Sequence, residues 1–319
     1  MNNIIKLAPA FKDYIWGGTK LKSLYGANEL ERLSEAWVLS NHPAGVSQIT
    51  EGEQGELLFN EYLEQIGKKG LGTKCEGFQD FPILIKWIDA KQSLSIQVHP
   101  EDEYALRVEG EYGKTEMWYI LDCEEGASLY YGVNKEITKE ELVERIKNNT
   151  ILEVLNEVKV HKGDVFFIEA GTIHAIGAGI VICEIQQNSN TTYRVYDFDR
   201  RDASGNPREL HIDKAVEVAT LKPALPKEKK EADVLTDSYK REWLGECTYF
   251  TTHKWEVKKQ VEIKITDESF LSIVVIEGEG KIELAGETMT FKKGDSLFIP
   301  AQEAEAYIKG ECTLITTKL

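Results

Sequence analysis

The sequence predicts a mainly β protein with two barrel-like domains and a few short helices. Three observations favour this fold class. Short runs of alternating apolar residues recur along the chain, Gly-rich or charged turns separate these runs, and one segment near the middle has a partner close to the C-terminus. Many short strands with turn residues at both ends are typical of a β-barrel or a β-sandwich.

The expected strands are short and mostly amphipathic. The clearest runs are 81–89 (FPILIKWID), 93–99 (SLSIQVH), 116–122 (EMWYILD), 164–170 (DVFFIEA) and 180–186 (IVICEIQ). Because side chains alternate between the two faces of a strand, such runs place every second residue on one face of a sheet.

The segment 138–156 predicts two short helices. Thr138 and Glu141 form a Thr-x-x-Glu capping box, which marks the start of a helix. A second Thr-x-x-Glu box begins at Thr150. We therefore expect a break between the two helices near 148–149.

A further helix is expected at 210–219, and the chain after it has the composition of a linker. The segment 222–234 is rich in Pro, Lys and Glu, as surface crossings between domains often are. The full length of 319 residues also suits two domains better than one. We expect an N-terminal domain over 1–221 with a helical insertion, and a C-terminal domain over 222–319.

The charge balance limits the classes of partner. The chain has 38 Lys and Arg against 54 Asp and Glu, a net charge of −16. Nucleic-acid binding needs a basic face, so we expect no nucleic-acid partner. A small anionic substrate would need a local basic pocket.

The sequence favours a cytoplasmic protein without a membrane anchor. No stretch reaches the ~18 apolar residues of a membrane span, and the N-terminus lacks the pattern of a signal peptide. The cysteines, which are odd in number, far apart and never in a CxxC pair, are Cys75, Cys123, Cys183, Cys247 and Cys312. We expect reduced thiols in a reducing compartment.

The repeated segment covers 161–174 and 292–305. Both copies read Lys-Gly-Asp, then an apolar strand, then a turn. Gly permits the positive φ that such a turn requires, and the strand after it is expected to be buried on one face. Two copies of this kind indicate two domains of one architecture.

The first copy resembles the second motif of the cupins, a family of small jelly-roll barrels. Gly171 and His174 stand at the Gly and His of that motif, although Glu169 replaces its usual Pro. In the second copy Gln302 and Glu305 replace the Gly and the His. We therefore expect two cupin domains, of which the C-terminal one binds no metal.

Four side chains form a candidate metal site. Gln97 and His99 share one face of their strand with Ser95, Glu116 opens another strand, and His174 closes the repeated turn. Each of these residues is weak support when taken alone, because a single histidine is more often hydrogen-bonded than metal-bound. Two imidazoles, a carboxylate and an amide oxygen in cupin order suit a divalent ion such as zinc, with an open position for substrate.

The chain also resembles the type I mannose-6-phosphate isomerases, in their short bacterial form. The matching segments are Trp16–Gly18, Ser34–Trp37, Ser95–Pro100, Lys114–Glu116, Gly171–Ala175, Glu184 and Gln187–Arg194. The resemblance runs over nearly the whole chain in the family's order and is strongest from 81 to 200.

This resemblance implies interconversion of mannose 6-phosphate and fructose 6-phosphate through an enediol, with one zinc ion per chain. Such a reaction needs a proton-transfer base and a positive group for the developing oxyanion. Arg194 matches the family's active-site arginine, and Lys114 and Glu184 are the two candidates for the acid or base. Some family members carry His where this chain has Gly113, so a mechanism that uses that histidine does not apply here.

Substrate contacts are expected from Ser95, Lys86 and Trp16. Lys86 is a charge inside an apolar strand, which either reaches the phosphate or extends to the surface. Two other classes stay open: a non-catalytic sugar-binding or regulatory cupin, and an iron dioxygenase of the cupin family. The dioxygenases usually have His-x-His in the first motif, where this chain has Gln97 and His99. The sequence leaves the oligomeric state open.

Overall fold

The computed structural model describes residues 4–51, 55–201 and 205–319. The protein is mainly β, which confirms the predicted fold class. It consists of two compact units. The first unit contains the chain up to Phe11, 36–86 and 227–319, and the second unit contains 12–35 and 87–226. These units interleave along the sequence, and the division into contiguous domains, 1–221 and 222–319, stays a prediction.

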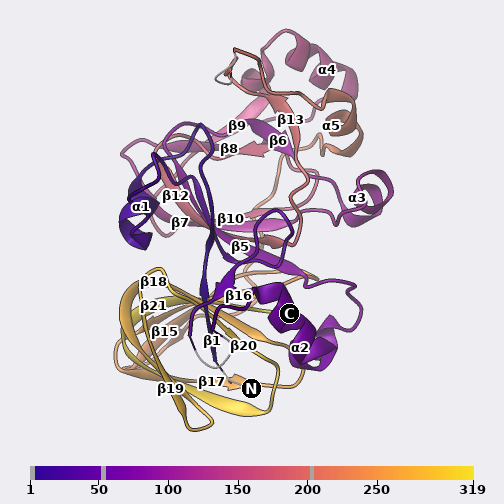
Figure 1. Cartoon of the computed structure of the whole chain (residues 1–319). Helices are drawn as coiled ribbons and strands as arrows, with labels where there is room; N and C mark the ends of the chain where they lie inside the picture. The colour runs from indigo at the N-terminus through magenta and orange to yellow at the C-terminus, as the bar shows by residue number, and fades with distance from the viewer. Residues whose placement is uncertain (1–3, 52–54, 202–204) are drawn as a thin grey trace. The chain divides into compact units, whose positions relative to one another are not determined.

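The first unit contains a ten-stranded antiparallel sheet (Figure 1). Its strands, in order, are β14 (Val234–Leu235), β15 (Tyr239–Glu246), β16 (Thr251–Val257), β21 (Ala304–Lys318), β18 (Leu271–Leu284), β20 (Ser296–Ile299), β1 (Ile5–Ala8) and β4 (Gln48–Ile49), with β17 (Gln260–Ile265) on β21 and β19 (Glu287–Lys292) on β18. In β17 the alternation is complete, since Val261, Ile263 and Ile265 are buried between exposed polar residues. These side chains join one apolar core with those of β18 and β21.

Aromatic residues fix the helix of the first unit. The α2 helix (Phe59–Leu71) leads through a kink at Gly67 to a short 3-10 helix, η1 (Thr73–Cys75). Phe59 is fully buried, and its ring centroid lies 5.4 Å from that of Phe81 and 5.1 Å from that of Phe298. This edge-to-face packing holds α2 against its own unit.

The second unit contains two groups of paired strands. One consists of β10 (Val165–Ile168), β7 (Glu116–Cys123), β12 (Ile180–Gln187) and β5 (Ile83–Ala90), which starts in the first unit; the other is a five-stranded sheet in the order β13 (Tyr193–Tyr196), β6 (Ile96–Val98), β11 (His174–Ala175), β8 (Ser128–Val133) and β9 (Leu155–Lys159). Two more short strands, β2 (Ala10–Lys12) and β3 (Glu35–Leu39), pair with each other. All five predicted strands are therefore present.

The helices of the second unit are short. They are α1 (Lys20–Tyr25), α3 (Asp102–Val108), α4 (Lys139–Lys147), the 3-10 helix η2 (Ile151–Val154) and α5 (Ile212–Val218). The predicted break occurs at Asn149, whose φ is 57°. The first capping bond is present, since the Glu141 amide donates to Thr138 Oγ1 at 3.1 Å. The second predicted helix is present as η2, but its predicted capping box is not, because Thr150 makes no side-chain capping bond.

The repeated segment forms the same turn twice. Gly163 and Gly294 have φ values of 95° and 94°. In each copy the aspartate amide donates to the carbonyl three residues earlier, at 3.1 Å for Asp164 and 3.0 Å for Asp295. The two strands that follow, β10 and β20, each pair antiparallel with a neighbour. The sequence repeat is therefore a structural repeat.

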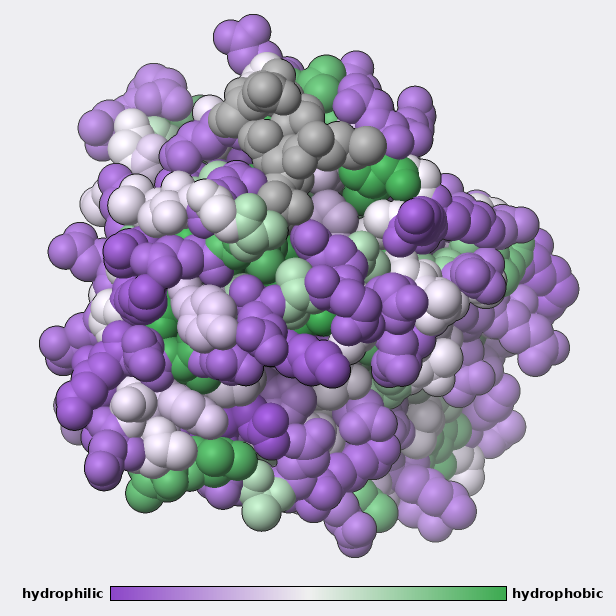
Figure 2. All heavy atoms as spheres, turned by 90° about the horizontal axis from the view of Figure 1, so that it is seen from below, coloured by the Kyte–Doolittle hydropathy of each residue, from purple (hydrophilic) through white to green (hydrophobic). Residues whose placement is uncertain are grey.

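One face of the molecule can be judged from its side chains. The face drawn in Figure 2 is mostly hydrophilic, with hydrophobic residues in small separate groups. Among the described residues, no helix is long and apolar enough to cross a membrane. All five cysteines are free thiols.

Candidate metal centre and active site

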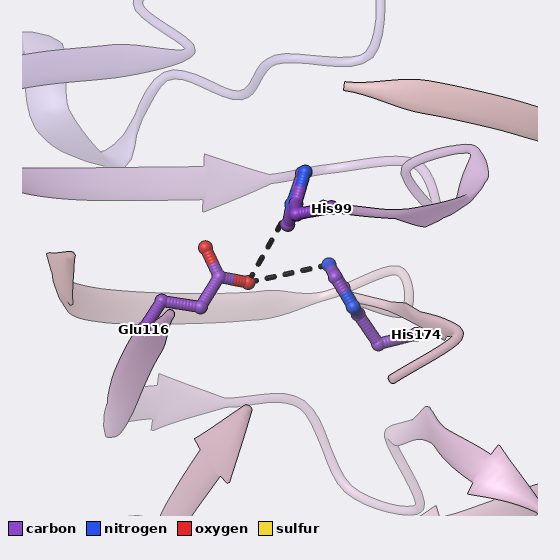
Figure 3. A group of neighbouring side chains, drawn as sticks. All are labelled: His99, Glu116 and His174. Carbon is purple, nitrogen blue, oxygen red and sulfur yellow. Dashed lines mark ion pairs between the residues drawn. The ribbon is translucent and has the colours of Figure 1, made fainter. Parts of the chain in front are cut away.

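Three predicted metal ligands meet inside the second unit (Figure 3). Glu116 Oε1 lies 3.2 Å from His174 Nε2 and 3.8 Å from His99 Nε2, and all three side chains are buried. The ligand atoms of this group lie within 4.8 Å of one another. A carboxylate and two imidazoles that converge in this way fit a divalent cation.

Strand pairing brings these residues together from distant parts of the chain. His174 in β11 pairs with Gln97 in β6, and Glu116 at the start of β7 pairs with Ile168 in β10. His99 follows directly after β6. The three ligands thus come from two neighbouring strands of the five-stranded sheet and one strand of the other group.

Backbone carbonyls fix the tautomer of both histidines. His99 Nδ1 donates to the Thr191 carbonyl at 2.9 Å, and His174 Nδ1 donates to the Thr172 carbonyl at 2.8 Å. A carbonyl oxygen only accepts, so Nδ1 carries the proton and Nε2 presents its lone pair to the cluster. Burial lowers the pKa of His174 to about 4, which keeps its imidazole neutral, as metal binding requires.

Gln97 lies beside the three ligands. Its amide nitrogen is 3.5 Å from His174 Nε2, and its Oε1 accepts from Ser95 Oγ at 3.4 Å. A half-turn of the amide group exchanges oxygen and nitrogen and would direct Oε1 at the cluster. A role for Gln97 as the fourth ligand stays a prediction.

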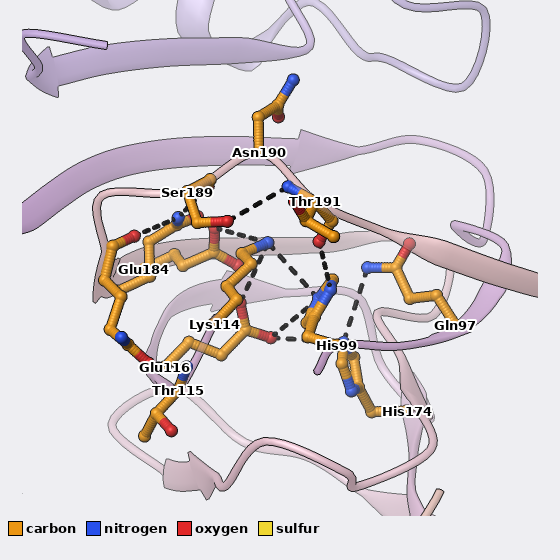
Figure 4. A network of polar contacts seen from close by, with 12 residues as sticks. Gln97, His99, Lys114, Thr115, Glu116, His174, Glu184, Ser189, Asn190 and Thr191 are labelled. Carbon is orange, nitrogen blue, oxygen red and sulfur yellow. Dashed lines mark hydrogen bonds and ion pairs between the residues drawn. The ribbon is translucent and has the colours of Figure 1, made fainter. Parts of the chain in front are cut away.

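Lys114 places a positive charge against the metal ligands (Figure 4). Its Nζ lies 3.2 Å from Glu116 Oε2, 3.4 Å from His99 Nε2 and 4.0 Å from Glu184 Oε1. Burial by itself lowers the pKa of Lys114, but Glu116, Glu184 and Glu35 outweigh burial and raise it above the ordinary value. The amine is therefore held as an ammonium.

Glu184 faces the same interior. Trp118 Nε1 donates to Glu184 Oε2 at 2.9 Å, while Oε1 faces Lys114. These partners fix the carboxylate at 3% exposure. The site thus contains a buried carboxylate in addition to the one in the metal cluster.

Arg194 adjoins Ser95, which in turn contacts Gln97. Its Nε donates to Ser95 Oγ at 3.3 Å, and its Nη1 donates to the Glu209 carbonyl at 2.9 Å. Its backbone amide donates to His211 Nδ1 at 3.2 Å. Burial and the nearby Arg208 lower the pKa of Arg194 from its ordinary value. Sequence reasoning missed His211, because its spacing carries no sign of this contact.

The structure places the other two predicted substrate contacts away from solvent. Trp16 is 4% exposed and packs in an apolar cluster that includes Trp118. Lys86 is 3% exposed, and its Nζ lies 4.6 Å from the ring centroid of Trp37 in the first unit. Substrate binding by Trp16 and Lys86 stays a prediction.

A second group of polar residues, which the sequence did not predict, supports Lys114. Asp102 Oδ1 accepts from the Gly113 amide and from Gln187 Nε2, each at 2.8 Å. Gln187 Oε1 accepts from the Thr115 amide, also at 2.8 Å. The amides on both sides of Lys114 are thereby tied to one pair of side chains.

Two protein-family models match parts of this chain. Residues 4–126 match the family described as phosphomannose isomerase type I, catalytic domain. Residues 240–319 match the family described as mannose-6-phosphate isomerase, cupin domain, which confirms the expected cupin architecture there.

Curated relatives cover almost the whole chain. The mannose-6-phosphate isomerase ManA of Bacillus subtilis is 41% identical over 98% of this chain and 97% of its own. The mannose-6-phosphate isomerase of Streptococcus mutans is 37% identical over 95% and 94%. A crystal structure of the mannose 6-phosphate isomerase from Bacillus subtilis covers 100% of both chains, with 39% identity and a TM-score of 0.92. The chain is therefore an enzyme that belongs to the type I mannose-6-phosphate isomerase family.

Proposed function

We propose that this enzyme interconverts mannose 6-phosphate and fructose 6-phosphate in a zinc-dependent reaction that passes through an enediol. The observation that carries the proposal is the convergence of His99, Glu116 and His174. Lys114 Nζ lies 3.2 Å from Glu116, and Glu184 lies 4.0 Å from that Nζ. A sugar phosphate as substrate follows from the family.

The ligand set supports a zinc ion. Both imidazoles present Nε2 to the carboxylate of Glu116, and carbonyl groups hold both Nδ1 atoms. Zinc bound there would supply Lewis-acid stabilisation of developing negative charge on the substrate oxygens. Gln97 is the proposed fourth ligand, and its weak amide oxygen suits a coordination shell that substrate can share.

Lys114 and Glu184 are the side chains that we propose to assist the proton transfer between C1 and C2 of the substrate. The raised pKa of Lys114 keeps it as an ammonium, so it is suited to stabilise a developing oxyanion. Glu184 is a buried carboxylate whose Oε1 lies 4.0 Å from that ammonium. We propose Glu184 as the base and Lys114 as the ammonium that stabilises the developing oxyanion.

Arg194 is the proposed partner of an enediolate or of the phosphate. A guanidinium binds either group through paired hydrogen bonds. Its contact with Ser95 Oγ connects it to Gln97, so substrate held there would be close to the proposed metal site. Ser95, Lys86 and Trp16 remain the proposed substrate contacts.

We also propose a cytoplasmic location, which the free thiols at all five cysteines support.

The other two classes are less well supported. A non-catalytic cupin would have no use for an ammonium and a base placed near the ligands, and curated isomerases match the chain over nearly its full length. Two histidines and a carboxylate also occur in non-haem iron oxygenases. The test below therefore includes iron as well as zinc.

The experiment measures metal content and isomerase activity on the same samples. The purified chain is stripped with a chelator, assayed in a coupled reaction with mannose 6-phosphate, and reloaded with zinc or with ferrous iron. We expect stripping to abolish turnover and zinc to restore it.

A variant pair completes this experiment. Glu116→Ala is expected to lose both metal and activity and to stay folded, whereas Glu144→Ala, an exposed carboxylate in α4, should keep both. Full activity in a sample verified as metal-free would refute zinc dependence, and oxygen uptake with iron would favour the dioxygenase class instead.

A further inference from the structure

We propose that Glu111 is a positioning residue for the metal ligand His99, and that it acts through the turn at 188–191. This proposal rests on the proposed metal site. Glu111 lies in the loop between α3 and β7, and its Oε2 accepts hydrogen bonds from the turn at 188–191. Its influence would pass through hydrogen bonds to the backbone of the turn.

The first step is the bond that orients His99. Its Nδ1 donates to the carbonyl of Thr191 at 2.9 Å, which leaves Nε2 directed at Glu116 (Figure 4). If this carbonyl moved, His99 could change its ring orientation or its tautomer. A carbonyl partner of this kind fixes a metal-binding histidine and raises its basicity.

The second step is the support of that carbonyl. Thr191 lies between β12 and β13, so strand pairing does not hold it. Glu111 Oε2 instead accepts from Thr191 Oγ1 at 2.9 Å and from the Asn190 amide at 3.1 Å. It also lies 3.4 Å from Ser189 Oγ, which accepts from the Thr191 amide at 3.2 Å. A single carboxylate oxygen thus contacts three consecutive residues of the turn.

The opposite side of the turn is also held. Gln186 Nε2 donates to the carbonyls of Gln187 and Ser189, each at 2.7 Å. Gln186 is completely buried, whereas Glu111 is half-buried. Gln186 thus holds the start of the turn, and Glu111 holds its end, where the Thr191 carbonyl lies.

The chain offers a matched control in Glu109. This carboxylate lies two residues earlier in the same loop and carries the same charge. It accepts from Tyr193 Oη at 2.8 Å and pairs with Lys214 Nζ at 2.7 Å, so it also holds neighbouring elements. It makes no recorded contact with the turn at 188–191 among the described residues. Glu111→Ala and Glu109→Ala therefore both remove one negative charge and the hydrogen bonds of one carboxylate.

The experiment measures the dissociation constant for zinc by competition with a chromophoric chelator, in the full chain without substrate. Replacement of a partner in the outer shell of a metal site typically weakens metal binding about 10–100-fold. Because Glu111 acts through one further residue, we expect Glu111→Ala to weaken zinc binding by about tenfold, the lower end of that range.

Three further variants distinguish a loss of positioning from a loss of charge. Glu111→Gln keeps an oxygen that can accept from Thr191 and should restore most of the affinity. Thr191→Val keeps the carbonyl but removes the Oγ1 donor, and should give an intermediate loss. Glu109→Ala should bind zinc like the wild type. Circular dichroism confirms that each variant is folded, and Glu111→Gln and Thr191→Val still test the proposal if Glu111→Ala does not fold.

The possible outcomes are distinct. Equal zinc affinity in the wild type, Glu111→Ala and Thr191→Val would overturn the positioning role and leave the proposed function intact. An equal loss in Glu111→Ala, Glu111→Gln and Glu109→Ala would also overturn it, because charge alone would explain the effect. A wild-type chain that binds no zinc would refute the proposed metal site, and the positioning role with it.

Discussion

Arg194 is held at three points by partners that carry no negative charge. A hydroxyl, a carbonyl and an imidazole nitrogen accept from its Nε, Nη1 and backbone amide. The hydroxyl and the carbonyl orient the guanidinium, and the imidazole holds the backbone of Arg194. The residue is therefore suited to stabilise charge that develops on the substrate.

Replacement of this residue should affect the rate more than the metal. Arg194→Ala is expected to lower kcat by ~10²–10³, as the loss of one oxyanion partner typically does. Its zinc content should stay at the wild-type level. Steady-state kinetics and elemental analysis on one preparation measure both. Arg145→Ala, which removes a surface arginine of α4 paired with Glu153, is the control. A near-normal kcat in Arg194→Ala would mean that Arg194 is structural.

His174 should make the metal-free protein sensitive to acid. Its pKa is about 4 in the folded chain against an ordinary value of 6.5, because burial opposes its charge. Between these two pH values the unfolded chain binds a proton at this residue and the folded chain does not. The neutral His174 therefore contributes fully to the free energy of unfolding above pH 6.5. As the pH falls towards 4, this contribution is lost, by about 3 kcal/mol in total.

Urea unfolding of the chelator-treated protein at pH 7 and pH 5 measures this loss. His174→Ala should flatten the pH dependence. His161→Ala, which removes an exposed histidine, should keep it. If His174→Ala and the wild type lose the same stability between these pH values, then His174 is not the group responsible.

At the scale of elements, the loop that carries Lys114 is fixed by close backbone packing. A Cβ atom on Gly113 would lie 2.6 Å from backbone atoms of Pro100, Glu101 and Asp102. The Lys114 amide also donates to the Pro100 carbonyl at 3.0 Å. Glycine at this position therefore lets the loop lie against the 100–102 segment.

A methyl group at this position should displace Lys114. Gly113→Ala is expected to cost about 1–3 kcal/mol of stability through overpacking. It should also lower kcat by up to ~10²-fold, since a small misplacement of a catalytic group has that effect. Denaturant titration and steady-state kinetics measure the two quantities. Gly77→Ala, where a Cβ meets nothing within 4 Å, is the matched control. Unchanged kcat and stability would show that the loop tolerates the shift.

The sequence predicted the strands and helices that are marked by a local pattern, such as alternation or a capping residue. Alternation placed the strands around Gln97 and Glu116, and the capping bond at Thr138 formed as expected. The second box, at Thr150, failed because a 3-10 turn replaces a regular helix start there. Contacts that depend on the path of loops, such as the carbonyl of Thr191 against His99, leave no pattern in the sequence.

At the scale of the whole molecule, one turn is used twice with different chemistry. The first copy ends at His174, which is buried beside Glu116. The second copy ends at Glu305, an exposed residue whose Oε2 accepts from Tyr307 Oη at 2.8 Å. The two copies share the turn, but only the first ends in a histidine that lies in the candidate metal cluster.

The metal content of the chain follows from this difference. A carboxylate without imidazole partners is a poor zinc ligand set. Among the described residues, the group His99, Glu116 and His174 is the one whose ligand atoms converge. Elemental analysis of the purified chain should therefore give one zinc per chain, and Glu305→Ala should leave that ratio and the activity unchanged. Two tightly held ions, with the second lost in Glu305→Ala, would show instead that the second copy of the turn also binds metal.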